Sequence, residues 1–220
     1  MKTDKHNSTD LKFTAWVVYG IVFIWFAFAL LMGVEHRFDA GPNKPPLAFG
    51  LTLLAPIVFF VAAYQRRGAI WQFCQSLDLR FVVAVHFWRV MALDFLLCAA
   101  AGTLPIGFAL PAGLGDILTG LAAIPLAFAL SNGTPGTRTK FVAWNIFGLL
   151  DLLVAVSMGI LHSGSSLGLL AGSGPTTQLM TELPRSMVPT FLVPMFMLLH
   201  MLGLARRNEV VSGALNPVSA

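Results

Sequence analysis

Charged residues are scarce in this sequence, and cysteine is scarcer still. Only 11% of the 220 residues are Asp, Glu, Lys or Arg, whereas 56% are hydrophobic, and the mean hydropathy is +0.77. Such a chain cannot present a polar surface to water on all sides, which excludes an ordinary soluble domain and indicates an integral membrane protein. The two cysteines, Cys74 and Cys98, offer neither a disulfide framework nor a metal-binding spacing, so we interpret them as packing thiols.

Several sequence motifs of membrane-embedded enzymes are also missing. The sequence contains no HExxH zinc-protease motif and no HxxxxD acyltransferase pattern. No group of residues has the spacing of a metal site, and we predict none. These absences make a lipid-modifying enzyme a weaker interpretation than a protein that transports or binds.

Six apolar stretches are each long enough to cross a hydrocarbon core of about 30 Å at about 1.5 Å per residue. We therefore predict an all-α fold: a polytopic membrane protein built as one bundle of six transmembrane helices. Residues 13–205 form this single domain, flanked by cytoplasmic tails at 1–12 and 206–220. The predicted spans are 13–34, 47–64, 80–101, 112–131, 141–162 and 187–205.

Lysine and arginine fall mostly on one side of this six-span arrangement. Because short loops rich in Lys and Arg stay on the cytoplasmic side, we predict that both termini are cytoplasmic in a bacterial-type inner (plasma) membrane. The side that carries the termini has Lys2, Lys5, Lys12, Arg66, Arg67, Arg80, Arg138, Lys140, Arg206 and Arg207; the other has Arg37, Lys44 and Arg185.

The net charge of +4 therefore lies where the topology rule places basic residues, against anionic lipid. We expect the lipid bilayer as the partner and no nucleic acid. The sequence leaves open whether the chain forms a homo-oligomer.

The connections between the spans carry their own signals. "GTLPIGFALPAG" is short, apolar and broken by prolines, which favours a tight hairpin over a shallow re-entrant turn. "QRRGAIWQFCQSLD" fits either a helix lying along the headgroups or the first turns of the third span. The Gly- and Ser-rich segment 163–186 is the longest loop, either a lid or partner contact or a flexible connection. Pro189 and Pro194 predict a kink or unwinding in the last span.

Four ionisable residues lie well inside the predicted spans: Arg89, Asp94, Asp116 and Asp151. A charge at the middle of a bilayer costs at least about 2.5–3.5 kcal/mol, so such residues face the interior of a bundle and are functional candidates by default. If one of the three aspartates neutralises Arg89, two carboxylates remain, and the set indicates a site that binds a proton or a cation. The alternative is that these groups only fix the packing through interhelical hydrogen bonds.

Depth along the helices predicts which of these groups meet. His86 and Arg89 share one face of the third span, whereas Asp94 is turned away from it. Asp151 lies at nearly the depth of Arg89, so we predict an Arg89–Asp151 ion pair. We also predict a layer of His86, His200 and Asn145 nearer the cytoplasm, and a deeper layer that holds Arg89, Asp94, Asp151 and, nearer the outer face, Asp116.

Three functions follow from this polar set. The first is proton- or cation-coupled transport of a small solute or ion, with Asp94, Asp116, Asp151, Arg89 and Asn145 as the ion- or proton-binding residues. The second is a b-type haem or quinone-linked electron-transfer subunit, because His86 and His200 at matching depth could ligate one haem. The third is a non-catalytic assembly subunit of a membrane complex.

Overall fold

The computed structural model describes the backbone of residues 2–42 and 44–210, and the side chains of this part from residue 11 onward. Within these limits all regular structure is helical. The elements are α1 (Lys2–Val34), α2 (Leu47–Gln65), α3 (Ala69–Ser76), α4 (Leu79–Ala84), the 3-10 helix η1 (Val85–Ala92), α5 (Leu93–Ala100), α6 (Ile106–Asn132), α7 (Thr137–Leu161), the 3-10 helix η2 (Thr177–Thr181), the π-helix η3 (Val188–Leu192) and α8 (Val193–Ala205).

Six helical stretches are long and apolar enough to cross a membrane, as predicted. Their bounds agree closely with the predicted spans, except that the fourth begins at Ile106 rather than at residue 112 and the fifth at Thr137 rather than at 141. Together they are compatible with a multi-pass membrane protein. They are Leu11–Val34, Leu47–Gln65, Leu79–Ala100, Ile106–Asn132, Thr137–Leu161 and Val188–Ala205.

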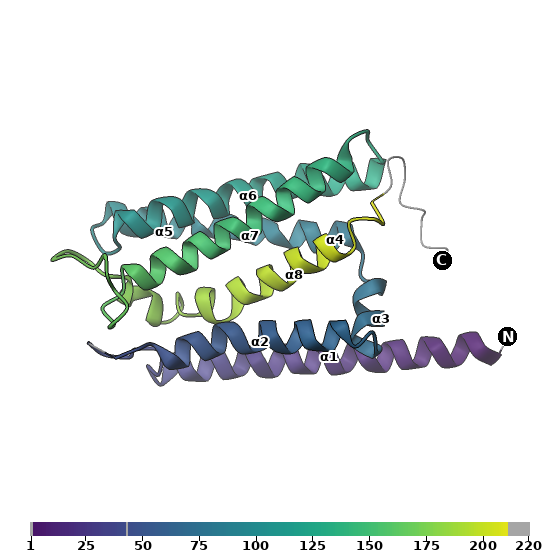
Figure 1. Cartoon of the computed structure of the whole chain (residues 1–220), viewed down its shortest axis with the longest axis horizontal. Coiled ribbons are helices and arrows are strands. Elements are labelled where there is room, and N and C mark those ends of the chain that lie inside the picture. Colours follow the sequence, from purple (N-terminus) through teal and green to yellow (C-terminus); the bar gives the residue numbers. More distant parts are fainter. Residues whose placement is uncertain (1, 43, 211–220) are drawn as a thin grey trace.

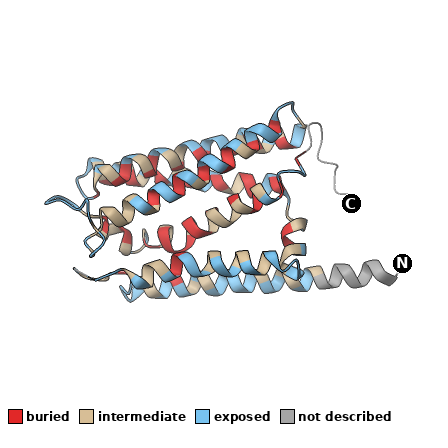
Figure 2. Cartoon of the chain, viewed as in Figure 1, coloured by how far each residue is buried: buried red, intermediate tan, exposed pale blue. Residues whose placement is uncertain are grey.

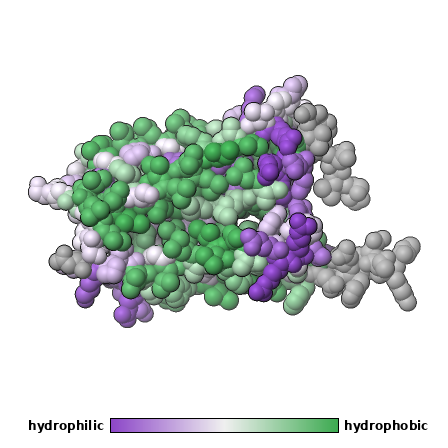
Figure 3. Space-filling model, in the orientation of Figure 1, coloured by the Kyte–Doolittle hydropathy of each residue, from purple (hydrophilic) through white to green (hydrophobic). Residues whose placement is uncertain are grey.

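Successive spans run in opposite directions, so that the start of α1 and the end of α8 lie at the same end of the bundle (Figure 1). We call this the basic end, because Arg66, Arg80, Arg138 and Arg206 lie at the helix ends there. The opposite end is the loop end, where residues 35–46, 101–105 and 162–187 connect the helices. Figure 3 shows a hydrophobic band between two more hydrophilic ends, the pattern that suits a bilayer.

The buried core belongs mainly to the last four spans. In α1 and α2, only 11% of the most apolar window is buried, against 39% to 50% in the other four spans. Figure 2 shows the same contrast, with buried residues concentrated on α4 to α8 and exposed ones on the α1–α2 hairpin. The large side chains that α1 exposes are apolar, such as Trp16 and Phe23, which is how a lipid-facing helix differs from a water-facing one.

Two connections between the spans can be compared with their sequence-based predictions. The α5–α6 connection is a tight hairpin, as predicted, with Gly102 in the left-handed region at φ 72°. The expectation that the whole proline-containing linker is non-helical was wrong, because α6 begins directly after Pro105 and includes Pro111. Pro105 is the N-cap of α6, where a backbone N–H has no partner within the helix, so a proline loses no hydrogen bond at this position. α3 is a separate helix rather than the first turns of the third span.

The two ends of the chain and the last span complete the fold. α1 is already helical at Lys2, so the segment predicted as an N-terminal tail continues the first helix. Of the predicted C-terminal tail, residues 211–220 lie outside the described part. The predicted unwinding of the last span is confirmed, since Val188–Leu192 winds as a π-helix that contains Pro189. Proline removes a backbone donor, and a wider turn is one way to accommodate that loss.

Candidate ion site inside the helix bundle

Arg89 lies at the centre of a buried polar cluster formed by four spans. Its Nε donates to Asp116 Oδ1 at 2.6 Å, and its Nη2 donates to Asp151 Oδ2. Its Nη1 lies 2.9 Å from His200 Nε2, and the Nδ1 of that histidine lies 3.0 Å from Asn145 Oδ1. We call Arg89, Asp116, Asp151, His200 and Asn145 the Arg89 cluster. The predicted Arg89–Asp151 pair is therefore present, and Asp116 joins it.

The 3-10 winding of η1 explains why the third span can place several residues toward the cluster. Every third residue from Val83 to Cys98 is buried, and His86, Arg89 and Ala92 belong to this series. A 3-10 helix has three residues per turn, so residues at i and i+3 are eclipsed, whereas an α-helix rotates them apart. Asp94 falls outside this series, which is why it does not face the cluster.

Hydrogen-bond directions in the cluster are mutually consistent. Asn145 Nδ2 donates to the Phe141 carbonyl at 2.8 Å, which leaves Asn145 Oδ1 as the acceptor for His200 Nδ1–H. His200 Nε2 is then the lone pair that accepts from Arg89 Nη1. This assignment, made from the network, makes His200 a neutral imidazole that orients the guanidinium from the side opposite the carboxylates.

Two glycines allow the helices to approach the cluster this closely. A Cβ on Gly148 would collide with His200 Nε2 and lie 3.1 Å from Arg89 Nη1. A Cβ on Gly115 would collide with Asp151 Oδ1. At Gly115, α6 and α7 are thus in close contact, which is typical of small residues between membrane-type helices.

The charges of the cluster do not balance. Arg89 is 1% exposed by its side chain, and it faces two carboxylates that are 8% and 6% exposed, Asp116 and Asp151. With both carboxylates ionised, the cluster carries one negative charge in excess. Since an uncompensated charge is costly to bury, the arrangement favours uptake of one proton or one cation.

Asp94, which we predicted in the deeper layer, does not join the cluster. Both of its carboxylate oxygens accept from Arg185, at 2.6 and 3.0 Å, and its side chain is 43% exposed. Arg185 belongs to the connection before η3, and the pairing raises its pKa further above the ordinary value of arginine. The sequence could not show this partner, because Arg185 lies 91 residues away and in a loop.

His86 lies against the cluster without a hydrogen bond to it. Its ring centroid is 4.1 Å from that of His200, and its Nδ1 lies 2.9 Å from the Val82 carbonyl. A bis-histidine haem needs the porphyrin plane between the two imidazole rings, and rings in direct contact leave no space for it. His200 also uses both of its nitrogens within the cluster. The residues present therefore do not fit the haem that we considered from the sequence.

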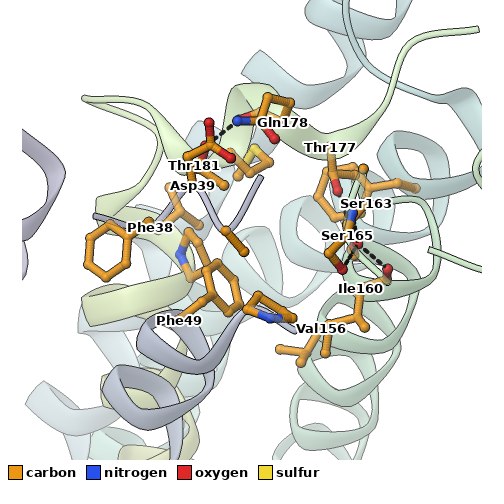
Figure 4. A pocket seen from close by; sticks show the side chains of 18 of the residues that line it. Phe38, Asp39, Phe49, Val156, Ile160, Ser163, Ser165, Thr177, Gln178 and Thr181 are labelled. Carbon is orange, nitrogen blue, oxygen red and sulfur yellow. Dashed lines mark hydrogen bonds between the residues drawn. The ribbon is translucent and has the colours of Figure 1, made fainter. Parts of the chain in front are cut away.

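A cavity of about 90 Å³ lies between the Arg89 cluster and the loop end. Its lining includes Asp116 of the cluster and exposed loop residues such as Asp39 and Gly164, so it connects the buried carboxylate with the loop end. In Figure 4, Asp39, Gln178 and Thr181 gather on one side of the cavity, and Ser163 and Ser165 on the other. These mouth residues come from loops whose position the sequence alone did not reveal.

The loop end is held together by local hydrogen bonds. The Asp39 carboxylate accepts from the Gly41 amide at 2.8 Å and from the side chain of Gln178 in η2. These bonds favour the ionised form and lower the pKa of Asp39 below its ordinary 3.8. Residues 163–186, predicted as a lid or partner contact or a flexible connection, thus cover the cavity with residues such as Thr177 and Thr181.

The basic end is closed by packing. The buried Arg206 side chain, at the end of α8, donates to the carbonyls of Cys74 and Leu77 and to Glu209. Desolvation raises the pKa of the neighbouring Cys74 thiol to about 11, which agrees with an inert packing role. Buried apolar residues fill the space between Arg206 and the two histidines, His86 and His200. In the described residues the cluster is therefore reached from the loop end.

One short pattern in the long loop resembles an enzyme motif but lacks its setting. Residues Gly164 to Gly168 have the form Gly-x-Ser-x-Gly around Ser166. In a nucleophile elbow this serine sits between a strand and a helix beside a histidine base. Here the segment is irregular, and no hydrogen bond from the Ser166 hydroxyl to a described residue is found.

A family model described as a domain of unknown function matches residues 45–206, which is well over half of the chain. The chain belongs to the DUF8737 family. The match to DUF8737 covers α2 to α8 and includes every residue of the Arg89 cluster, whereas α1 precedes it. No curated protein and no solved structure matches the sequence.

Among the described residues of this DUF8737 protein, no group of three or more His, Cys, Asp or Glu side chains could hold a metal ion. The cluster contains instead one guanidinium, one imidazole, one amide and two carboxylates. The carboxylate oxygens of such a set can accept a proton or coordinate a cation.

Proposed function

We propose that this protein is a transporter of the cytoplasmic membrane that couples the movement of a small solute or ion to a proton or cation bound at the Arg89 cluster. The observation that supports it most directly is the charge imbalance: one buried guanidinium pairs with two buried carboxylates. A single proton or monovalent cation makes the cluster neutral. The loaded and unloaded cluster then differ by one buried charge, which is the kind of difference that can drive a change between two conformations.

Access from one side only supports the same proposal. The cavity links Asp116 to the loop end, while Arg206 and the apolar core close the basic end. If the basic residues face the cytoplasm, the loop end is extracytoplasmic, and we propose that this conformation is the outward-facing one. Alternation to an inward-facing state would expose the cluster to the cytoplasm along His86 and His200.

Two irregular helix segments are suited to that movement. Val188, Pro189 and Val193, in and next to the π-helix η3, line the cavity, and the 3-10 helix η1 holds Arg89. Irregular turns within long helices mark hinges, because a change of winding rotates the side chains beyond them. Rewinding of η1 as an α-helix would turn Arg89 away from His86 and Ala92 and break its present set of bonds.

Proton movement in proteoliposomes tests the proposal. Purified protein is reconstituted with a pH-sensitive dye inside the vesicles, and gradients of Na⁺, K⁺ and methylammonium are imposed in turn. We expect proton counter-movement with at least one cation, and a reduction of about tenfold or more in Asp116→Asn and in Asp151→Asn.

Asp94→Asn is the matched control, since it makes the same chemical change in the same bundle but outside the cluster. It should keep the wild-type rate. Folding of each variant is verified by thermal unfolding in detergent. Wild-type rates in both cluster variants would overturn the proposed function, as would the absence of proton movement under every gradient.

A further inference from the structure

The charged residues that line the loop-end cavity are all acidic. They are Asp39 at the mouth and Asp116 at the inner end. The Asp116 side chain is 8% exposed, and its Oδ1 accepts from Arg89, whereas no described residue donates a hydrogen bond to its Oδ2. The cavity thus ends at a carboxylate oxygen that has no donor, and its lining contains no basic residue. Such a cavity attracts a cation and disfavours an anion.

The walls between the two carboxylates are apolar and aromatic. Phe38, Phe49, Phe95 and Phe108 belong to the lining, together with aliphatic residues such as Val156, whereas the hydroxyl and amide side chains of the lining come from the segment 163–181 at the mouth. Figure 4 labels Phe38, Phe49, Val156 and Ile160 among these apolar lining residues. A hydrated metal ion gains little from such a wall. The binding of an organic cation is stabilised in two ways, because its alkyl groups bury apolar surface and its charge is attracted to aromatic faces.

We infer that the cavity binds a small organic ammonium ion, with its charge at Asp116 and its alkyl groups against the phenylalanine wall. A volume of about 90 Å³ limits its size. About 10–15 Å³ of such cavity volume holds one water molecule. The cavity therefore holds a solute of about six non-hydrogen atoms. Simple amines and small quaternary ammonium ions have this size.

The position of Asp116 links this solute to the proton. The same carboxylate belongs to the Arg89 cluster and lines the cavity, so an ammonium ion and a proton compensate the same excess charge. Binding of the ammonium ion therefore weakens binding of the proton, and binding of the proton weakens binding of the ammonium ion, which is negative thermodynamic coupling. This step rests on the proposed function, and it makes the transport an exchange of a proton for an organic cation.

Calorimetric titration of the purified full-length chain with tetramethylammonium chloride tests the inference. Tert-butanol, which has the same number of non-hydrogen atoms and no charge, is the matched ligand, and sodium acetate is the anionic one. We expect binding of tetramethylammonium alone, with release of about one proton per ion, measured in weak buffer with a pH indicator. Asp116→Asn should weaken binding by about 30-fold or more, because it removes the partner of a buried charge.

Two more variants keep the test open if Asp116→Asn fails to fold. Gly159→Leu narrows the cavity without touching the cluster, since a Cβ at Gly159 meets only Phe108, at 3.5 Å. It should also abolish binding, whereas Asp94→Asn should leave it unchanged. Equal binding of tert-butanol, binding of acetate instead, or unchanged tetramethylammonium binding in Gly159→Leu would overturn the inference.

The two proposals can fail separately. Proton movement driven by Na⁺ or K⁺ that depends on Asp116 and Asp151, without tetramethylammonium binding, would overturn the organic-cation site and leave the proposed function. Tetramethylammonium binding at Asp116 without any proton movement would support the site and overturn the transport cycle.

Discussion

Loss of Arg89 should destabilise the protein far more than loss of either carboxylate that pairs with it. Arg89→Met keeps an unbranched side chain as far as the position of Nε and removes the only guanidinium that contacts Asp116 and Asp151 in the described structure. Two buried carboxylates then face each other without a cation. Removal of one partner of a buried ion pair costs about 3–5 kcal/mol. For a chain of this size each kcal/mol lowers the Tm by about 2–4 °C, so we expect a decrease of about 6–20 °C.

Asp151→Asn should behave quite differently. It leaves one carboxylate for one guanidinium, and the new amide oxygen can still accept from Arg89 Nη2. Removal of the excess charge offsets the weaker hydrogen bond, and we expect a change within about 1 kcal/mol. The double variant Asp116→Asn/Asp151→Asn leaves Arg89 unpaired and should be about as unstable as Arg89→Met.

Thermal unfolding in one detergent, followed by intrinsic fluorescence, measures the whole series. Arg185→Met is the matched control, because the Arg185–Asp94 pair is partly exposed and contributes at most about 1 kcal/mol. The reasoning fails if Arg89→Met unfolds at the same temperature as Arg185→Met. It fails equally if Asp151→Asn costs as much as Arg89→Met, since the charge imbalance would then have no energetic effect.

Three further predictions concern packing, pH and thiol chemistry. Gly148→Ala places a methyl group against His200 and should cost about 1–3 kcal/mol in thermal unfolding, whereas Gly159→Ala, with ordinary contacts, should cost less; equal costs would contradict the close approach. Because its pKa is lowered in the folded state, Asp39 stabilises the loop end above pH 3.8 and loses this effect as the pH falls further. Hydrogen exchange of its loop should therefore increase in acid in the wild type but not in Asp39→Asn. Cys74, buried and with a pKa of about 11, should react slowly with iodoacetamide at pH 7.5 in a Cys98→Ala background, and fast labelling would refute its burial.

The sequence predicted the architecture because the signals for it are local. A run of apolar residues long enough to cross a bilayer requires no knowledge of its neighbours, and the six spans were found with ends that mostly agree with the helices. The same holds for the prolines of the last span, whose effect on backbone hydrogen bonds is confined to one turn. Depth along the helices was enough to predict the Arg89–Asp151 pair.

The sequence could not show which polar groups face each other around a helix axis. Asp94 and Asp116 were both predicted in the deeper layer, yet one pairs with the loop residue Arg185 and the other with Arg89. The 3-10 winding of η1, which rotates Arg89 into the cluster, has no separate sequence signal. The two histidines that shared a depth proved to be in ring contact, which removed the haem interpretation.

The amino-acid sequence by itself therefore determined the six apolar helices and the small number of charges within them. It could do so because hydrophobicity and helix length are properties of contiguous residues. Tertiary structure alone decided that Arg89 meets two carboxylates and that one of them ends a cavity, because these contacts depend on how helices distant in sequence rotate and pack. A residue's cost of burial can be estimated from its type, but its partner is set by the packing of the whole bundle.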